Sequence, residues 1–136
     1  YSQGGNMKKT ALSLIVMLGT FGLLPAASAA PTSKIVEVRV SDVIVPGGFD
    51  SNSDAYVIET GLFPNGCYRW SHAQTVQADS NTIEIHSFAT VQSGMCIMVM
   101  VPFHKEIRLG KLSRGTHTLR FMNSDGTYLE EQLTIE

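Results

Sequence analysis

Alternation of apolar and polar residues with a period of two runs through most of this sequence, and it constrains the fold more than any other feature. In the segment Thr82–Thr90, for example, Ile83 and Ile85 alternate with polar residues. Turn-forming groups such as 46–48 (PGG) and 123–126 (NSDG) divide the pattern into short runs. Successive side chains of a strand point to opposite faces of a sheet, so each run predicts a half-buried β-strand.

The pattern predicts seven or eight short strands, and no amphipathic helix is expected among them. Val43 and Val45 depart from the alternation of Val36–Val40, which predicts a β-bulge near 41–42. The expected strands are Val36–Val45, Ala55–Leu62, Trp70–Ala78, Thr82–Thr90, Cys96–Val101, Glu106–Leu109, Thr116–Met122 and Thr127–Ile135. Cys96–Val101 is apolar on both faces and is expected to be a central strand. The fold class is therefore all-β, an antiparallel β-sandwich, with a small barrel as the alternative.

The first 30 residues have a different composition, which is typical of a secretory signal peptide. Lys8 and Lys9 precede an apolar run, and the small residues 26–30 follow it. The apolar run is about 15 residues long, whereas a membrane-spanning helix needs about 20. We therefore expect upstream residues at 1–6, a helical signal peptide at 7–29 cleaved after Ala29, and one β-sandwich domain at 30–136. This predicts a periplasmic or secreted protein that does not span the membrane.

Two cysteines, Cys67 and Cys96, follow the predicted leader. In an oxidising compartment such a pair normally forms a structural disulfide. The alternative is a free redox or catalytic pair, which would need a C-x-x-C spacing or a cationic helix start, and neither is visible.

A calcium site is suggested by the loop in which Asp50, Asn52 and Asp54 alternate, because this matches the opening of a calcium-binding loop. The match then ends, since Ala55 replaces the required glycine and Gly61 stands where a bidentate glutamate should be. The alternative is a polar loop with Asx turns.

Zinc or copper could be held by histidine and methionine residues. His72 and His86 share one face of a hairpin if its turn contains the three residues Asp79–Asn81, and lie on opposite faces with a two-residue turn. A softer cluster suited to copper(I) comprises Met95, Cys96, Met98, Met100 and His104. A disulfide would remove the thiolate, and methionines in a strand more often fill a core.

No catalytic motif is visible: the sequence lacks a nucleophile elbow, an H-E-x-x-H pair and a glycine-rich phosphate loop. We expect no catalytic residues and no cofactor. A glycan-binding face could be lined by Phe49, Tyr56, Tyr68 and Trp70. The alternative is that the single tryptophan lies in the centre of the sandwich core.

The run Leu112-x-x-Gly115-x-His117 resembles the turn into the penultimate strand of immunoglobulin-like and fibronectin-type domains. There a tyrosine bonds back to the preceding turn, so the resemblance implies that His117 is buried and bonded to backbone. The wider pattern, which includes Gly66-Cys67-Tyr68 and Cys96, resembles small exported bacterial β-sandwich domains. This resemblance implies an immunoglobulin-like sandwich and no activity.

The net charge argues against one class of partner, nucleic acid. Ten Lys and Arg residues stand against 12 Asp and Glu residues, a net charge of −2, so there is no basic excess for binding nucleic acid. The sequence therefore predicts an exported, non-enzymatic binding or structural module, whose partner is another protein or a cell-surface glycan. The alternative is a periplasmic metal-binding protein.

Overall fold

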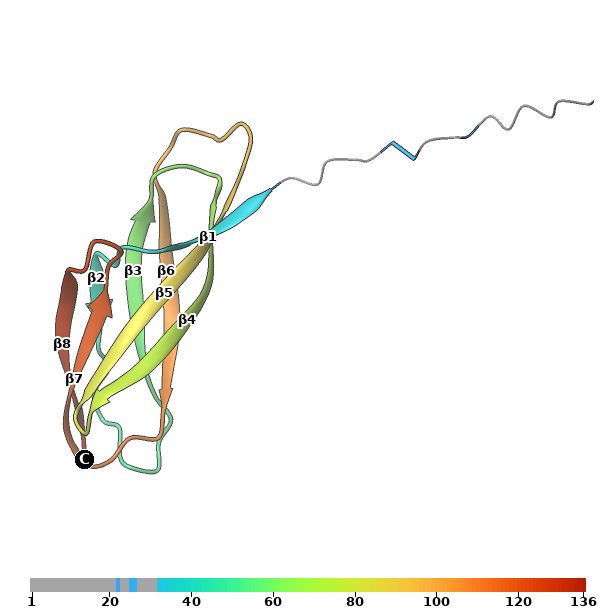
Figure 1. The fold of residues 1–136 in the computed structure, drawn as a ribbon. Helices are drawn as coiled ribbons and strands as arrows, with labels where there is room; N and C mark the ends of the chain where they lie inside the picture. Colours follow the sequence, from blue (N-terminus) through green and yellow to red (C-terminus); the bar gives the residue numbers. More distant parts are fainter. Residues whose placement is uncertain (1–21, 23–24, 27–31) are drawn as a thin grey trace, which may run out of the picture.

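The computed structural model describes Gly22, Pro25, Ala26 and residues 32–136, and this part of the chain contains eight strands and no helix (Figure 1). The predicted signal peptide, 7–29, falls almost wholly outside the described residues. None of the described residues belongs to a helix long and apolar enough to cross a membrane. The strands are β1 (Ser33–Glu37), β2 (Asp42–Ile44), β3 (Ala55–Phe63), β4 (Tyr68–Asp79), β5 (Thr82–Gln92), β6 (Val101–Gly110), β7 (Gly115–Met122) and β8 (Tyr128–Ile135).

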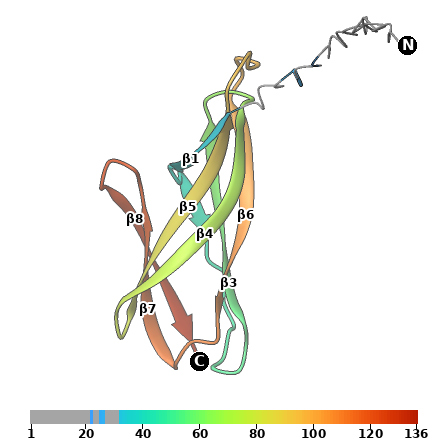
Figure 2. The same ribbon diagram turned by 45° about the vertical axis from the view of Figure 1, so that its right-hand side comes forward.

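The strands form two packed sheets, so the predicted β-sandwich is confirmed (Figures 1 and 2). The smaller sheet has the order β2-β3-β6. In the larger sheet, β4 pairs with β5 along nearly all of its length. On the other side of β5, residues 82–86 pair with β7 and residues 88–92 pair with β1. Because a strand has only two edges, β1 and β7 follow one another along the second edge of β5. The β5–β7 pair is parallel and all other strand pairs are antiparallel, so the sandwich is mostly rather than wholly antiparallel.

The predicted β-bulge near 41–42 is wrong, because the chain changes sheets there. β1 pairs with β5 in the larger sheet, whereas β2 pairs with β3 in the smaller one. Between them the Val38 amide donates to the Ser87 carbonyl at 2.8 Å, and the Ser41 amide donates to the Thr60 carbonyl at 2.8 Å. A crossing between sheets and a bulge both shift the alternation by one residue, so the sequence alone does not distinguish them.

The predicted central strand Cys96–Val101 is also wrong. Residues 93–100 form a loop, and β6 begins at Val101 and continues through Pro102 to Gly110. Proline is tolerated here because β6 is an edge strand that pairs only with β3. The apolar run therefore lies outside the sheet, although its composition resembles that of a buried strand.

The core lies between the facing sheets and is built from alternate residues of the long strands. Its largest fully buried apolar side chains are Phe121, Ile85, Leu119, Leu133 and Ile135. A Cβ atom at Gly61 would lie 2.5 Å from the ring of Phe103, so glycine allows this ring to pack directly on β3.

His117 occupies the position that the sequence predicts for it. The side chain is only 3% exposed, and its Nε2 lies 2.7 Å from the carbonyl oxygen of Ser113 in the preceding turn. A carbonyl oxygen can only accept, so the hydrogen sits on Nε2 and the ring donates it. The predicted link between this strand and its turn is therefore confirmed.

Replacing His117 with Phe is expected to destabilise the fold by about 1 kcal/mol, because the hydrogen bond to Ser113 is lost while an aromatic ring still fills the site. The loss stays modest because Ser113 is exposed and water can reach it. Chemical denaturation of both proteins measures the difference. A variant as stable as the parent would contradict a stabilising role for this bond.

Candidate binding surface

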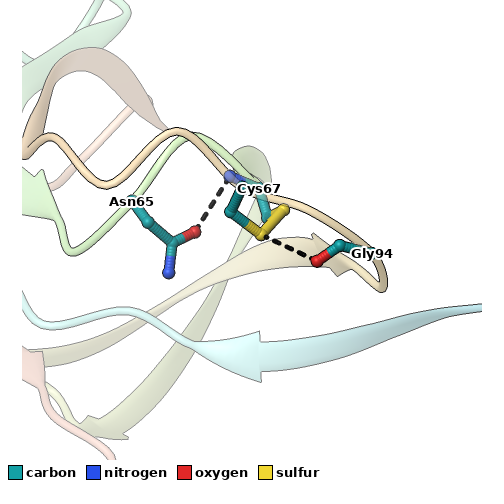
Figure 3. The surroundings of a disulfide bond; sticks show 4 residues. Asn65, Cys67 and Gly94 are labelled. Atoms are coloured by element: carbon teal, nitrogen blue, oxygen red, sulfur yellow. Dashed lines mark hydrogen bonds between the residues drawn. A yellow bond between two sulfur atoms is a disulfide. The ribbon is translucent and has the colours of Figure 1, made fainter.

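A disulfide ties together the two loops at one end of the sandwich. Cys67, at the end of the β3–β4 loop, is bonded to Cys96 in the β5–β6 loop, with 5.3 Å between the Cα atoms, as the sequence predicts. The Gly66 amide also donates to the Ile97 carbonyl at 2.9 Å. The Asn65 side-chain oxygen accepts a hydrogen bond from the Cys67 amide at 2.9 Å. Figure 3 shows this bond beside the disulfide. The β5–β6 loop is therefore held at two adjacent points.

Residues 93–100, which we call the apolar loop, extend beyond the strand ends around them (Figures 1 and 2). Cys96 anchors the loop, and the apolar side chains around it point into solvent. They are between 55% and 104% exposed and comprise Met95, Ile97, Met98, Val99 and Met100. Five exposed apolar side chains in six consecutive residues form one contiguous apolar surface rather than isolated exposed residues.

Charges near the apolar loop are exclusively positive in the segments that form this end of the sandwich. Lys34 of β1 pairs with Val91, and Arg69 of β4 pairs with Thr90, so both cations lie near the end of β5 from which the loop begins. Both side chains are exposed. No Asp or Glu occurs in 32–36, 60–78 or 87–105, although the chain as a whole carries net negative charge.

A hollow of about 420 Å³ adjoins the apolar loop between the start of β1 and the end of β5. Lys34 lines it, together with residues 91–94. Ile35 and Leu62, which are 62% and 50% exposed, extend the apolar character of this end of the molecule. This end of the sandwich thus combines a protruding apolar tip with one cation on either face of the larger sheet.

The structure places the methionine-rich cluster neither around a free thiolate nor in the core, which are the two arrangements that the sequence suggests. Cys96 is in a disulfide and has no thiolate to offer a metal. The methionines do not fill the core either, because all three on the loop are exposed. The loop therefore presents thioether side chains to its surroundings, and these are adaptable apolar contact groups.

The histidine pair has the register in which both rings share one face. His72 pairs with Phe88 and His86 pairs with Gln74. Each ring nevertheless has another neighbour: His72 stacks on Phe88 with 5.0 Å between centroids, and His86 Nδ1 lies 2.7 Å from a carboxylate oxygen of Glu37. Within the described residues, no three His, Cys, Asp or Glu side chains are placed to hold one metal ion.

The loop that was a calcium candidate is a hydrogen-bonded turn. The Asp50 carboxylate accepts from the Asn52 amide and from the Ser53 hydroxyl, both at 2.9 Å. These two bonds hold the pKa of Asp50 below its ordinary value, and the bond from Ser53 has the larger effect. Asp54 follows this turn and is exposed. The arrangement is the Asx turn that was the alternative to a calcium loop.

The four aromatic residues do not form one face. Phe49 packs edge-on against Tyr56 at the beginning of β3, with 5.3 Å between ring centroids. Tyr68 stacks on Phe63 at the opposite end of that strand, and Trp70 is half-buried beside the core. The rings therefore pack against the fold in two separate places.

A buried glutamate, which the sequence analysis missed, links the two sheets. Glu59 of β3 is fully buried. One of its oxygens accepts a hydrogen bond from Trp70 Nε1 of β4 at 2.9 Å, and the other accepts from the Ser87 hydroxyl of β5 at 2.7 Å. The Lys105 ammonium lies 5.4 Å from the centroid of the Trp70 ring. Burial raises the pKa of Glu59, and the bonds from Ser87 and Trp70 oppose that rise.

The buried Glu59 and the exposed apolar loop each leave a signal in the sequence. Glu59 falls on the inward parity of its strand, between Val57 and Gly61, where an acidic residue requires hydrogen-bond partners. The apolar loop lacks the alternation of the neighbouring strands and begins with Ser93-Gly94. An unalternated apolar run beside a cysteine can form an exposed, tethered loop as well as a central strand.

Comparison with known proteins identifies a family. A family model described as the ORF11 beta-sandwich domain matches residues 57–135, which covers the sandwich from within β3 to the last residue of β8. No curated protein and no solved structure matches the chain.

Proposed function

Since the chain belongs to the ORF11 beta-sandwich domain family, we propose that it is an exported, non-enzymatic binding module whose contact surface is the apolar loop 93–100. The observation that carries this proposal is the exposure of five neighbouring apolar side chains on a loop tied down by a disulfide. Surfaces of this kind are costly in water and mark interaction sites in folded proteins. The tether reduces the conformational freedom that binding would otherwise have to remove.

Export is supported by the disulfide and by the leader-like composition of the first 30 residues. Disulfides persist in oxidising compartments and are rare in the cytosol. We therefore propose that the protein acts in the periplasm or outside the cell, after removal of a signal peptide.

A partner with apolar contact groups fits the loop better than a glycan. Thioether and aliphatic side chains offer almost no hydrogen bonds to sugar hydroxyls. The aromatic rings that could stack on sugars pack against the fold at two separate ends. Methionine is, in addition, enriched in protein contact surfaces.

Site-specific photo-crosslinking tests the binding role. A photoreactive phenylalanine analogue is placed at position 98 of the loop, in cells that produce and export the protein. The matched control carries it at position 76, where Val76 is also exposed, at 49%, but lies near the opposite end of β4. We expect a defined adduct, with a protein or with a lipid, from position 98 and none from position 76. Equal labelling from both positions, or none from either, would refute the assignment of this surface.

A further inference from the structure

We propose that the partner of the apolar loop is an anionic lipid surface, into which the loop inserts while Lys34 and Arg69 contact the headgroups. This inference rests on the proposed function, because it names the partner of the same surface. Three observations carry it: the shape of the loop, the distribution of charge around it, and the way the fold supports it.

The shape of the loop suits a soft apolar phase. Met95 and Met98 are 104% and 80% exposed, so their side chains stand out from the fold instead of lining a groove. A convex tip of apolar side chains needs no complementary cavity in its partner. A lipid interface accommodates such a tip by local rearrangement of its acyl chains.

Charge complementarity favours a lipid surface that is anionic. The segments around the loop contain Lys34 and Arg69 and no acidic residue. The acidic side chains of Asp50 and Asp79 lie at the turns before β3 and between β4 and β5, away from the loop end of these strands. Cations next to an apolar anchor strengthen binding to anionic lipid by about 1 kcal/mol each, or about fivefold. The protein therefore presents its positive end to the membrane although its net charge is −2.

The backbone of the loop limits how deeply it can insert. Irregular backbone exposed to hydrocarbon is not tolerated, because its amide and carbonyl groups lose their water partners. One of these backbone groups already has a partner within the protein, because the Ile97 carbonyl accepts a hydrogen bond from the Gly66 amide. The loop therefore belongs at the depth of the headgroup and acyl-chain boundary, about 5–10 Å into the interface.

Flotation of the purified protein with lipid vesicles tests the proposal. One vesicle set is an equal mixture of phosphatidylglycerol and phosphatidylcholine, and the other is phosphatidylcholine alone. We expect binding to the anionic vesicles that is at least about fivefold tighter than to the neutral ones, and that weakens as salt is raised. In the Met98→Trp variant, tryptophan emission should shift to the blue on binding and be quenched by brominated acyl chains.

Three variants test the residues. The double substitution Met95→Asp with Met98→Asp should weaken vesicle binding by about tenfold or more, since it removes two anchors and adds two repelled charges. Val76→Asp, at the far end of β4, should leave it unchanged. Lys34→Glu together with Arg69→Glu should weaken binding and reduce its dependence on salt. A melting curve for each variant establishes that it is folded.

The outcomes separate this proposal from the binding role on which it rests. No binding to anionic vesicles, or equal binding by the parent and the double aspartate variant, overturns the lipid proposal. If a protein adduct then forms from position 98 alone, the binding module stands and its partner is a protein. Self-association that the aspartates abolish would instead identify the partner as a second copy of the chain, and would equally overturn the lipid proposal.

Discussion

Reduction of the Cys67–Cys96 disulfide is expected to lower the melting temperature by well over 10 °C. The bridge joins residues 29 positions apart, and closing such a loop in the unfolded chain contributes about 3.6 kcal/mol in the chain-entropy model. A domain of this size has a net stability of only about 5–15 kcal/mol. Each kcal/mol corresponds to about 4–8 °C in melting temperature for 60–100 residues.

Thermal melts with and without a reductant, followed by circular dichroism, measure this effect. The double variant Cys67→Ser, Cys96→Ser should melt close to the reduced parent and should not respond to the reductant. This control separates loss of the bridge from other effects of the reagent. A melting temperature that is unchanged by reduction, in a sample whose free thiols have been counted by alkylation, would contradict the prediction.

The sequence predicts the sandwich because alternation is a local property. The predicted strands Ala55–Leu62 and Thr116–Met122 each differ from β3 and β7 by one residue at one end only. The pairing of β5 with β7 in parallel does not follow from the alternation, which records the face of each residue and not the neighbour of each strand. Strand order depends on how distant segments pack, and the sequence holds no local record of it.

The prediction for the apolar loop is wrong for a related physical reason. Composition and periodicity do not distinguish a buried apolar run from an exposed one, and they therefore predict a central strand at 96–101. The cysteine pairing was nevertheless predicted, because it depends on the compartment and on the number of cysteines. Together, a disulfide-bonded Cys96 and the unalternated residues around it would have pointed to a tethered loop.

Removing the hydroxyl of Ser87 is expected to destabilise the protein strongly when Glu59 is ionised and less when it is protonated. Ser87 is 1% exposed and donates to the fully buried Glu59 carboxylate. Loss of a buried bond to a charged group costs about 1.5–3 kcal/mol, against about 1 kcal/mol for a neutral one. Substitution with alanine changes little besides this hydroxyl, so Ser87→Ala isolates the bond.

The pH dependence follows from the raised pKa of Glu59. In the unfolded chain this carboxyl ionises near its ordinary pKa of 4.5, whereas burial favours its protonated form in the folded state. The folded state therefore binds the proton more tightly, and stability should fall as pH rises from about 4.5 through the raised pKa and then level off. Ser87→Ala removes a bond that lowers this pKa, so its stability should fall further over a wider range.

Denaturation curves across this pH range, for the parent, Ser87→Ala, Glu59→Gln and the double variant, provide the test. Glu59→Gln has no charge to bury, so its stability should lack this component of the pH dependence. In the glutamine background Ser87→Ala removes only a neutral hydrogen bond, and its cost should be about 1 kcal/mol at every pH. If Ser87→Ala instead costs the same in both backgrounds at all pH values, the carboxylate does not depend on Ser87.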